Sequence, residues 1–122
     1  PRDVIASLLT KNWGPTTPLE GLDWIEKRLL AGHEALSVIN PAKKITIALE
    51  DLAINSREQT YKKLLAFLKI SDAPAMQKFF AESMTPDAAT SGRWKTEIDS
   101  PEFSAGFEAM SARLTKAGVV FQ

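Results

Sequence analysis

One strand-like segment constrains the fold of this chain more than any other feature of the sequence. Residues 44–50 alternate, with Ile45, Ile47 and Leu49 on one side and smaller side chains on the other, which is typical of a β-strand. No second segment has this pattern, and a lone strand cannot satisfy its own backbone donors and acceptors. The sequence therefore predicts an α/β fold that is mostly α with one main strand, and it predicts that the other strands of the sheet lie outside these 122 residues.

Helical patterns surround this segment on both sides. Thr17, Pro18 and Glu20 supply a cap hydroxyl, a first-turn proline and a capping-box glutamate, which together predict the start of a long helix. Asn40 and Pro41 predict its end. Further helices are expected at residues 3–11, 57–69, 74–83 and from 101 to the glycine at 118, with residues 84–98 as an irregular connection. Because no repeat or flexible linker interrupts the chain, residues 1–122 are interpreted as one portion of a single domain.

Composition argues against several functional classes. The chain contains no cysteine and a single histidine, His33, so neither a thiolate site nor a multi-histidine zinc site can be built. Its 15 basic and 15 acidic residues balance, which argues against binding of nucleic acid or of an anionic membrane surface. The longest apolar runs fall far short of the roughly 20 residues that span a bilayer. We therefore expect a cytoplasmic protein with no nucleic-acid partner, no membrane partner and no metal.

Three short motifs follow one another along the chain. Residues 1–7 read Pro-Arg-Asp-Val-Ile-Ala-Ser, residues 50–52 read Glu-Asp-Leu ahead of Leu-Leu-Ala-Phe-Leu at 64–68, and residues 91–95 read Ser-Gly-Arg-Trp-Lys. With this order and spacing, the chain resembles the carboxy-terminal half of sulfotransferases that use 3′-phosphoadenosine 5′-phosphosulfate (PAPS). The resemblance covers nearly the whole chain. It implies a P-loop-like α/β sandwich and transfer of a sulfuryl group from PAPS to an acceptor hydroxyl or amine.

The resemblance also implies a site for the 3′-phosphate of PAPS, held by Ser7, Gly92 and Arg93. A hydroxyl and backbone amides near a helix start favour an anion, glycine lets the backbone approach a ligand, and arginine supplies charge. The well-studied cytosolic members carry Arg-Lys-Gly a few residues ahead of the glycine, where this chain has Asp-Ala-Ala at 87–89. Two other interpretations stay open: Ser7 as an ordinary helical serine, and Trp94 as a core anchor that leaves Arg93 in solvent.

No catalytic residue is assigned within the chain. His33 lies on the apolar stripe of the long helix and is interpreted as structural, and no Gly-x-x-x-x-Gly-Lys loop is present to cradle the 5′-phosphosulfate. The resemblance places that loop and the catalytic base in an amino-terminal half outside this sequence. The expected partners are that half, PAPS or its product 3′-phosphoadenosine 5′-phosphate (PAP), and an unidentified acceptor, and the chain alone is predicted to be inactive. The alternative is a noncatalytic helical protein-interaction module with exposed apolar faces.

Overall fold

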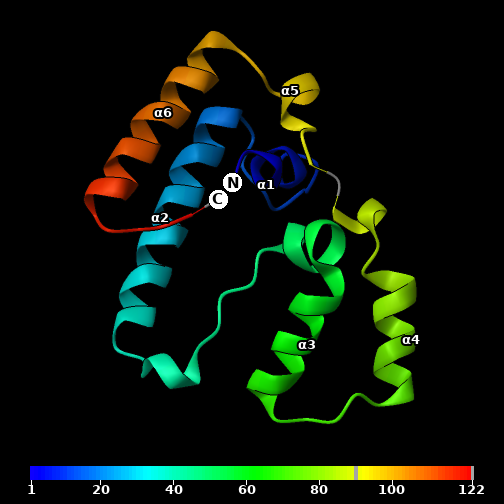
Figure 1. Ribbon diagram of the computed structural model, residues 1–122. Helices are drawn as coiled ribbons and strands as arrows, with labels where there is room; N and C mark the ends of the chain where they lie inside the picture. Colours follow the sequence, from blue (N-terminus) through cyan, green and yellow to red (C-terminus); the bar gives the residue numbers. More distant parts are fainter. Residues whose placement is uncertain (90, 122) are drawn as a thin grey trace. The chain divides into compact units, whose positions relative to one another are not determined.

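The computed structural model describes residues 1–89 and 91–121, and every regular element among them is helical (Figure 1). The α-helices are α1 (Arg2–Leu8), α2 (Pro18–Ser37), α3 (Arg57–Leu68), α4 (Pro74–Ser83), α5 (Trp94–Glu97) and α6 (Pro101–Lys116). Shorter helical turns of other types are η1 (Pro41–Lys43), η2 (Asp51–Asn55) and η3 (Pro86–Ala89). None of the described helices is long and apolar enough to cross a membrane.

The described residues form two compact units. The terminal unit comprises Pro1–Ile39 and Ser91–Gln122, and the central unit comprises Asn40–Thr90. The terminal unit is therefore assembled from both ends of the chain, with α1 and α2 from one end and α5 and α6 from the other. The assignment of residues 1–122 to a single domain stays a prediction.

The predicted strand is not formed. Lys44 has extended backbone angles, φ −134° and ψ 146°, but residues 44–48 join no strand among the described residues. From Leu49 the chain becomes helical, and the amides of Asp51 and Leu52 both donate to the Ala48 carbonyl at 3.2 Å. The predicted α/β fold, a P-loop-like sandwich with one main strand, is thus wrong, because the regular elements of the described residues are all helical. The physical reason is that a strand needs a second strand to pair with, and the described residues contain none.

Close helix contacts build the core of the terminal unit. Helix α2 packs against α6, and α1 packs against α2 and α5. Glycine permits two of these approaches, because a Cβ atom added at Gly21 would lie 2.5 Å from Ile5 and one added at Gly106 would lie 2.8 Å from Leu22. The largest fully buried side chains are Phe103, Ile5, Met110 and Leu114. Three of the core side chains, Phe103, Met110 and Leu114, therefore come from α6.

Local capping chemistry sets the helix ends largely as the sequence predicts. The Thr17 hydroxyl accepts from the Glu20 amide at 3.2 Å, while the Glu20 carboxylate accepts from the amide of Thr16. The Ser100 hydroxyl accepts from the Phe103 amide at 3.1 Å and starts α6. The predicted irregular connection at 84–98 is wrong in part, because it contains η3 and α5.

A small aromatic core holds the central unit together. The rings of Tyr61 and Phe80 stack with centroids 4.2 Å apart and planes 7° from parallel, and Leu65 is buried with them. Arg57 links α3 to the end of α4, because its Nε donates to the Met84 carbonyl at 3.0 Å and its Nη2 to the Phe80 carbonyl at 3.4 Å. These contacts place α3 beside α4 in a helical hairpin.

Candidate functional site

Asp3 joins two of the three sequence motifs. It lies in the first turn of α1, and its carboxylate accepts hydrogen bonds from the backbone amides of Gly92 at 2.9 Å and Trp94 at 3.1 Å. These partners are 89 and 91 residues away along the chain. The segment that contains Gly92 and Arg93 is therefore fixed against the helix that contains Ser7.

Ser7 lies one turn further along the same helix. It follows Asp3 by four residues, a spacing that places both side chains on one side of α1. Ser7 is half-buried, and its carbonyl accepts from the amide of Thr10 at 3.3 Å and from the hydroxyl of Thr10 at 2.8 Å. Among the described residues, no hydrogen bond joins Ser7 to Gly92 or Arg93. The structure thus brings the two motifs together through Asp3 and does not link the predicted phosphate ligands directly.

Gly92 has a backbone conformation that favours glycine, and the space beside it is open. Its φ of 86° lies in the left-handed region, which other residues rarely adopt. A Cβ atom added there would meet no atom within 4 Å. The glycine is therefore favoured by the backbone turn and not by tight packing.

Arg93 is already paired. Its Nε donates to Glu97 Oε1 at 2.8 Å and its Nη2 to Glu97 Oε2 at 3.1 Å, and the two side chains are 38% and 37% exposed. The hydrogen bonds to Glu97 raise the pKa of Arg93 above its ordinary value. A guanidinium has five N–H donors, so donors remain for a phosphate oxygen. Any anion bound here must nevertheless share Arg93 with a neighbouring carboxylate.

Trp94 attaches the same segment to the core. It is partly buried against the core of the terminal unit, and the Arg2 guanidinium lies 3.8 Å from the centre of its ring and 4.7 Å from that of Phe107. Such stacking fixes a cation over an aromatic face. These contacts fit the alternative in which Trp94 anchors the segment in the core. They also place a second cation, Arg2, beside the segment that contains Arg93. The sequence did not predict this role for Arg2, although Arg2 belongs to the same motif as Ser7.

Residues 87–89, Asp51 and His33 differ in their surroundings. Residues 87–89, where the family has Arg-Lys-Gly, lie in η3 of the central unit and supply no cation. Asp51 accepts from the Asn55 side-chain amide at 3.3 Å, and His33 is exposed on α2. Within the described part of the chain, no three His, Cys, Asp or Glu side chains are grouped so that they could hold a metal ion.

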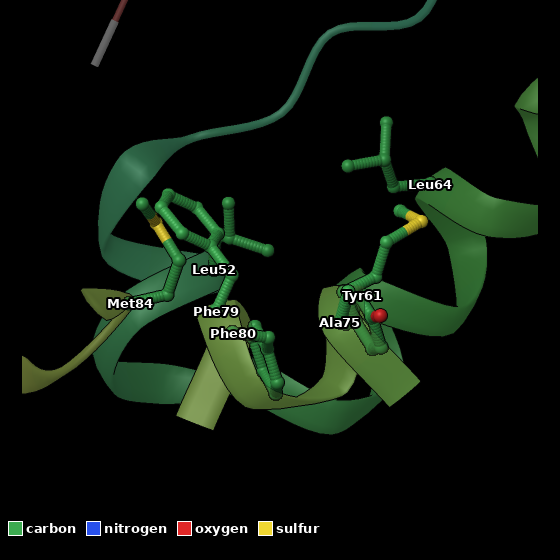
Figure 2. Close-up of a pocket in the computed structure, with 8 residues that line it drawn as sticks. Leu52, Tyr61, Leu64, Ala75, Phe79, Phe80 and Met84 are labelled. Atoms are coloured by element: carbon green, nitrogen blue, oxygen red, sulfur yellow. The ribbon is translucent and has the colours of Figure 1, made fainter. Parts of the chain in front are cut away.

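A second candidate site is an apolar pocket in the central unit (Figure 2). It has a volume of about 360 Å³, and its walls come from η2, α3 and α4 together with the residue that follows α4, Met84. Its lining consists of leucine, alanine, methionine and aromatic side chains. The sequence did not predict a pocket between these helices.

Comparison of the chain with models of protein families, with curated proteins and with solved structures finds no match. The sulfotransferase interpretation therefore depends on the motifs and on how the structure arranges them.

Proposed function

We propose that this chain is part of a sulfotransferase that transfers a sulfuryl group from PAPS to an acceptor hydroxyl or amine. In this proposal Ser7, Gly92 and Arg93 contribute to binding the 3′-phosphate of the nucleotide. The observation that carries the proposal is the pair of hydrogen bonds from Gly92 and Trp94 to Asp3, because they connect two motifs that bind the same phosphate in the family this chain resembles.

The local chemistry of this region is compatible with an anion. Arg2, Arg93 and Lys95 provide three cations against the two carboxylates of Asp3 and Glu97. The space beside Gly92 is open, although its amide already donates to Asp3. The guanidinium donors that Arg93 does not use favour charge-assisted hydrogen bonding, which is stronger than neutral hydrogen bonding. A phosphate that bound here would be attracted by local charge, since the net charge of the whole chain is zero.

The role of these residues in the reaction would be positioning. In sulfuryl transfer the acceptor oxygen or nitrogen forms a bond to sulfur while the bond between sulfur and the bridging phosphate oxygen breaks, and PAP leaves. The acceptor proton passes to a base, which we expect in the amino-terminal half. Contacts to the remote 3′-phosphate orient the donor for in-line attack, and such binding energy at a non-reacting group supports turnover as well as affinity.

The test compares two nucleotides in the intact protein, which would contain the expected amino-terminal half. Calorimetric titration with PAP and with adenosine 5′-phosphate isolates the contribution of the 3′-phosphate. Arg93→Ala should weaken PAP binding by roughly 10- to 100-fold, the usual range for a hydrogen bond to a charged group, and should leave adenosine 5′-phosphate nearly unchanged. Arg28→Ala is the matched control, because Arg28 is an exposed arginine of the same unit that stacks on Trp24.

Three outcomes bear on the proposal. Glu97→Gln should tighten PAP binding by roughly two- to fivefold, since it removes a competing acceptor and a like charge near the phosphate. Equal losses of both nucleotides in Arg93→Ala would remove Arg93 from the phosphate site. Sulfate transfer by residues 1–122 alone would refute the division of roles between this chain and an amino-terminal half.

The alternative, a noncatalytic protein-interaction module, is favoured by one observation. Large apolar side chains are exposed in both units, among them Trp13 at 69% and Phe79 at 58%. Patches of this kind mark interaction surfaces when they are contiguous. If the intact protein bound PAP and adenosine 5′-phosphate with equal weakness, this alternative would replace the sulfotransferase proposal.

A further inference from the structure

The pocket of the central unit is concave and apolar. Figure 2 shows Phe79 and Met84 on one side of it and Leu64 and Ala75 on the other. The stacked rings of Tyr61 and Phe80 also belong to the lining. Pockets of several hundred cubic ångströms that are lined mostly by apolar side chains are typical binding sites for small molecules. The pocket therefore has the form of a ligand site.

Tyr61 is the one lining side chain of the pocket that carries an oxygen or nitrogen atom. The Tyr61 hydroxyl donates to the Asp72 carboxylate at 2.6 Å. Arg57 lies over the Phe80 ring and donates to the carbonyls of Phe80 and Met84, and it is not among the lining residues. A charged group placed inside would lose its hydration without gaining a partner, which is costly. An occupant of this pocket is therefore uncharged.

The size of the pocket limits the size of the occupant. An engineered apolar cavity of about 150 Å³ binds benzene, and this pocket has a volume of about 360 Å³. By that ratio it has room for a molecule of about ten to fourteen carbon atoms. Met76 and Met84 contribute two flexible thioether side chains to the walls, which adapt to ligands of different shape.

We infer that the central unit binds an uncharged aromatic or aliphatic small molecule in the pocket between α3 and α4. Binding is driven by burial of carbon surface and requires no hydrogen bond from the protein. The inference does not depend on the proposed sulfotransferase activity, because every residue that carries it belongs to the central unit and none is a predicted phosphate ligand.

The methionines provide a direct test with an internal control. The chain has three: Met76 and Met84 line the pocket, whereas Met110 is fully buried in the core of the terminal unit. Toluene is titrated into protein labelled with ¹³C at the methionine methyl groups. We expect saturable ring-current shifts of the Met76 and Met84 methyl signals, with a Kd on the order of 1 mM for a ligand of this size, and an unchanged Met110 signal.

Two comparisons sharpen the test. Benzoate has the same ring with a carboxylate in place of the methyl group, and it should bind at least about tenfold more weakly because its charge cannot be paired. Ala75→Phe should fill the pocket and abolish the toluene-dependent shifts. Ala81→Phe places the same side chain at another exposed position of α4 that does not line the pocket, and it should leave toluene binding intact.

Several results would overturn the inference. These are equal shifts at Met110, benzoate binding as tight as toluene binding, and toluene binding that survives Ala75→Phe. Shifts of the Met76 and Met84 signals that follow protein concentration without toluene would assign the pocket to contact between copies of the chain instead. A toluene titration with no shift at either methionine would also contradict the inference.

Discussion

Replacing Asp3 with alanine removes the carboxylate that holds the Gly92–Trp94 segment against α1. Two backbone amides, separated from Asp3 by about three quarters of the chain, then lose their acceptor. Because the terminal unit is built from both ends of the chain, this contact is one of the links between them. Its loss should destabilise the terminal unit and free the segment that carries Gly92 and Arg93.

The magnitude follows from the two hydrogen bonds. A hydrogen bond to a charged group contributes about 1.5–3 kcal/mol, and the lower value applies here because Asp3 is only half-buried. For two bonds, Asp3→Ala should lower the free energy of unfolding of the terminal unit by about 3 kcal/mol. Asp3→Asn keeps one acceptor oxygen and should cost about half as much. Glu108→Ala removes an exposed carboxylate of α6 and should change stability by less than about 0.5 kcal/mol.

The distribution of aromatic residues makes the assay selective. All three tryptophans, Trp13, Trp24 and Trp94, belong to the terminal unit, whereas the single tyrosine, Tyr61, belongs to the central unit. Urea unfolding followed by tryptophan fluorescence therefore reports on the terminal unit. Hydrogen exchange at the amide of residue 92 should accelerate in Asp3→Ala more than exchange in the middle of α2. If Asp3→Ala and Glu108→Ala unfolded at the same urea concentration, the reasoning from this contact would be refuted.

Two further predictions concern pH. The hydrogen bond to Asp72 raises the pKa of Tyr61 from its ordinary 10.0 to about 12, so it stabilises the fold below pH 10.0 and this contribution is lost as the pH rises through about 12. A pH titration of the tyrosinate absorbance should show this pKa, because Tyr61 is the only tyrosine. Asp72→Asn should return the pKa of Tyr61 toward 10.0. A midpoint near 10.0 in the unaltered protein would contradict the hydrogen bond between Tyr61 and Asp72. The hydrogen bonds from Arg113 lower the pKa of Glu26 below its usual 4.5, so their contribution to stability is present above pH 4.5 and is lost as the pH falls through the lowered value. Arg113→Gln should therefore be less stable than the unaltered protein at neutral pH, with a difference that shrinks below pH 4.5; a difference that did not change with pH would count against the ion pair.

Short-range chemistry made the helices predictable. Thr17 and Ser100 cap the helices that follow them, and Gly118 takes the left-handed conformation, φ 77°, just after α6. Each of these features involves residues within one turn, so the sequence contains the whole interaction. Helix α5 was missed because it has only four residues, although the spacing of Arg93 and Glu97 is the i, i+4 pattern of a helical ion pair.

Long-range pairing explains the errors. The alternation of Ile45 and Ile47 is a real feature of the sequence, but a strand exists only when another strand pairs with it, and local alternation contains no information about a partner. The prediction of the candidate site was limited in the same way, because it also depends on residues that are far apart in the sequence. The sequence pointed to Gly92 and Arg93, whereas the residue that positions them, Asp3, acts across 89 residues, a contact that no local pattern reveals.

Because the terminal unit is split, its two parts leave the ribosome before and after the central unit. Helices α3 and α4 are synthesised before α6, so the nascent central unit can fold while α2 still lacks the helix that covers it. Until α6 emerges, α2 lacks this packing partner, and an apolar side chain such as Leu22, which lies against Gly106 of α6, is more available to chaperones or to neighbouring nascent chains. Slow translation between residues 40 and 100 would lengthen that vulnerable interval, and the yield of folded protein should therefore depend on the speed of elongation as well as on final stability.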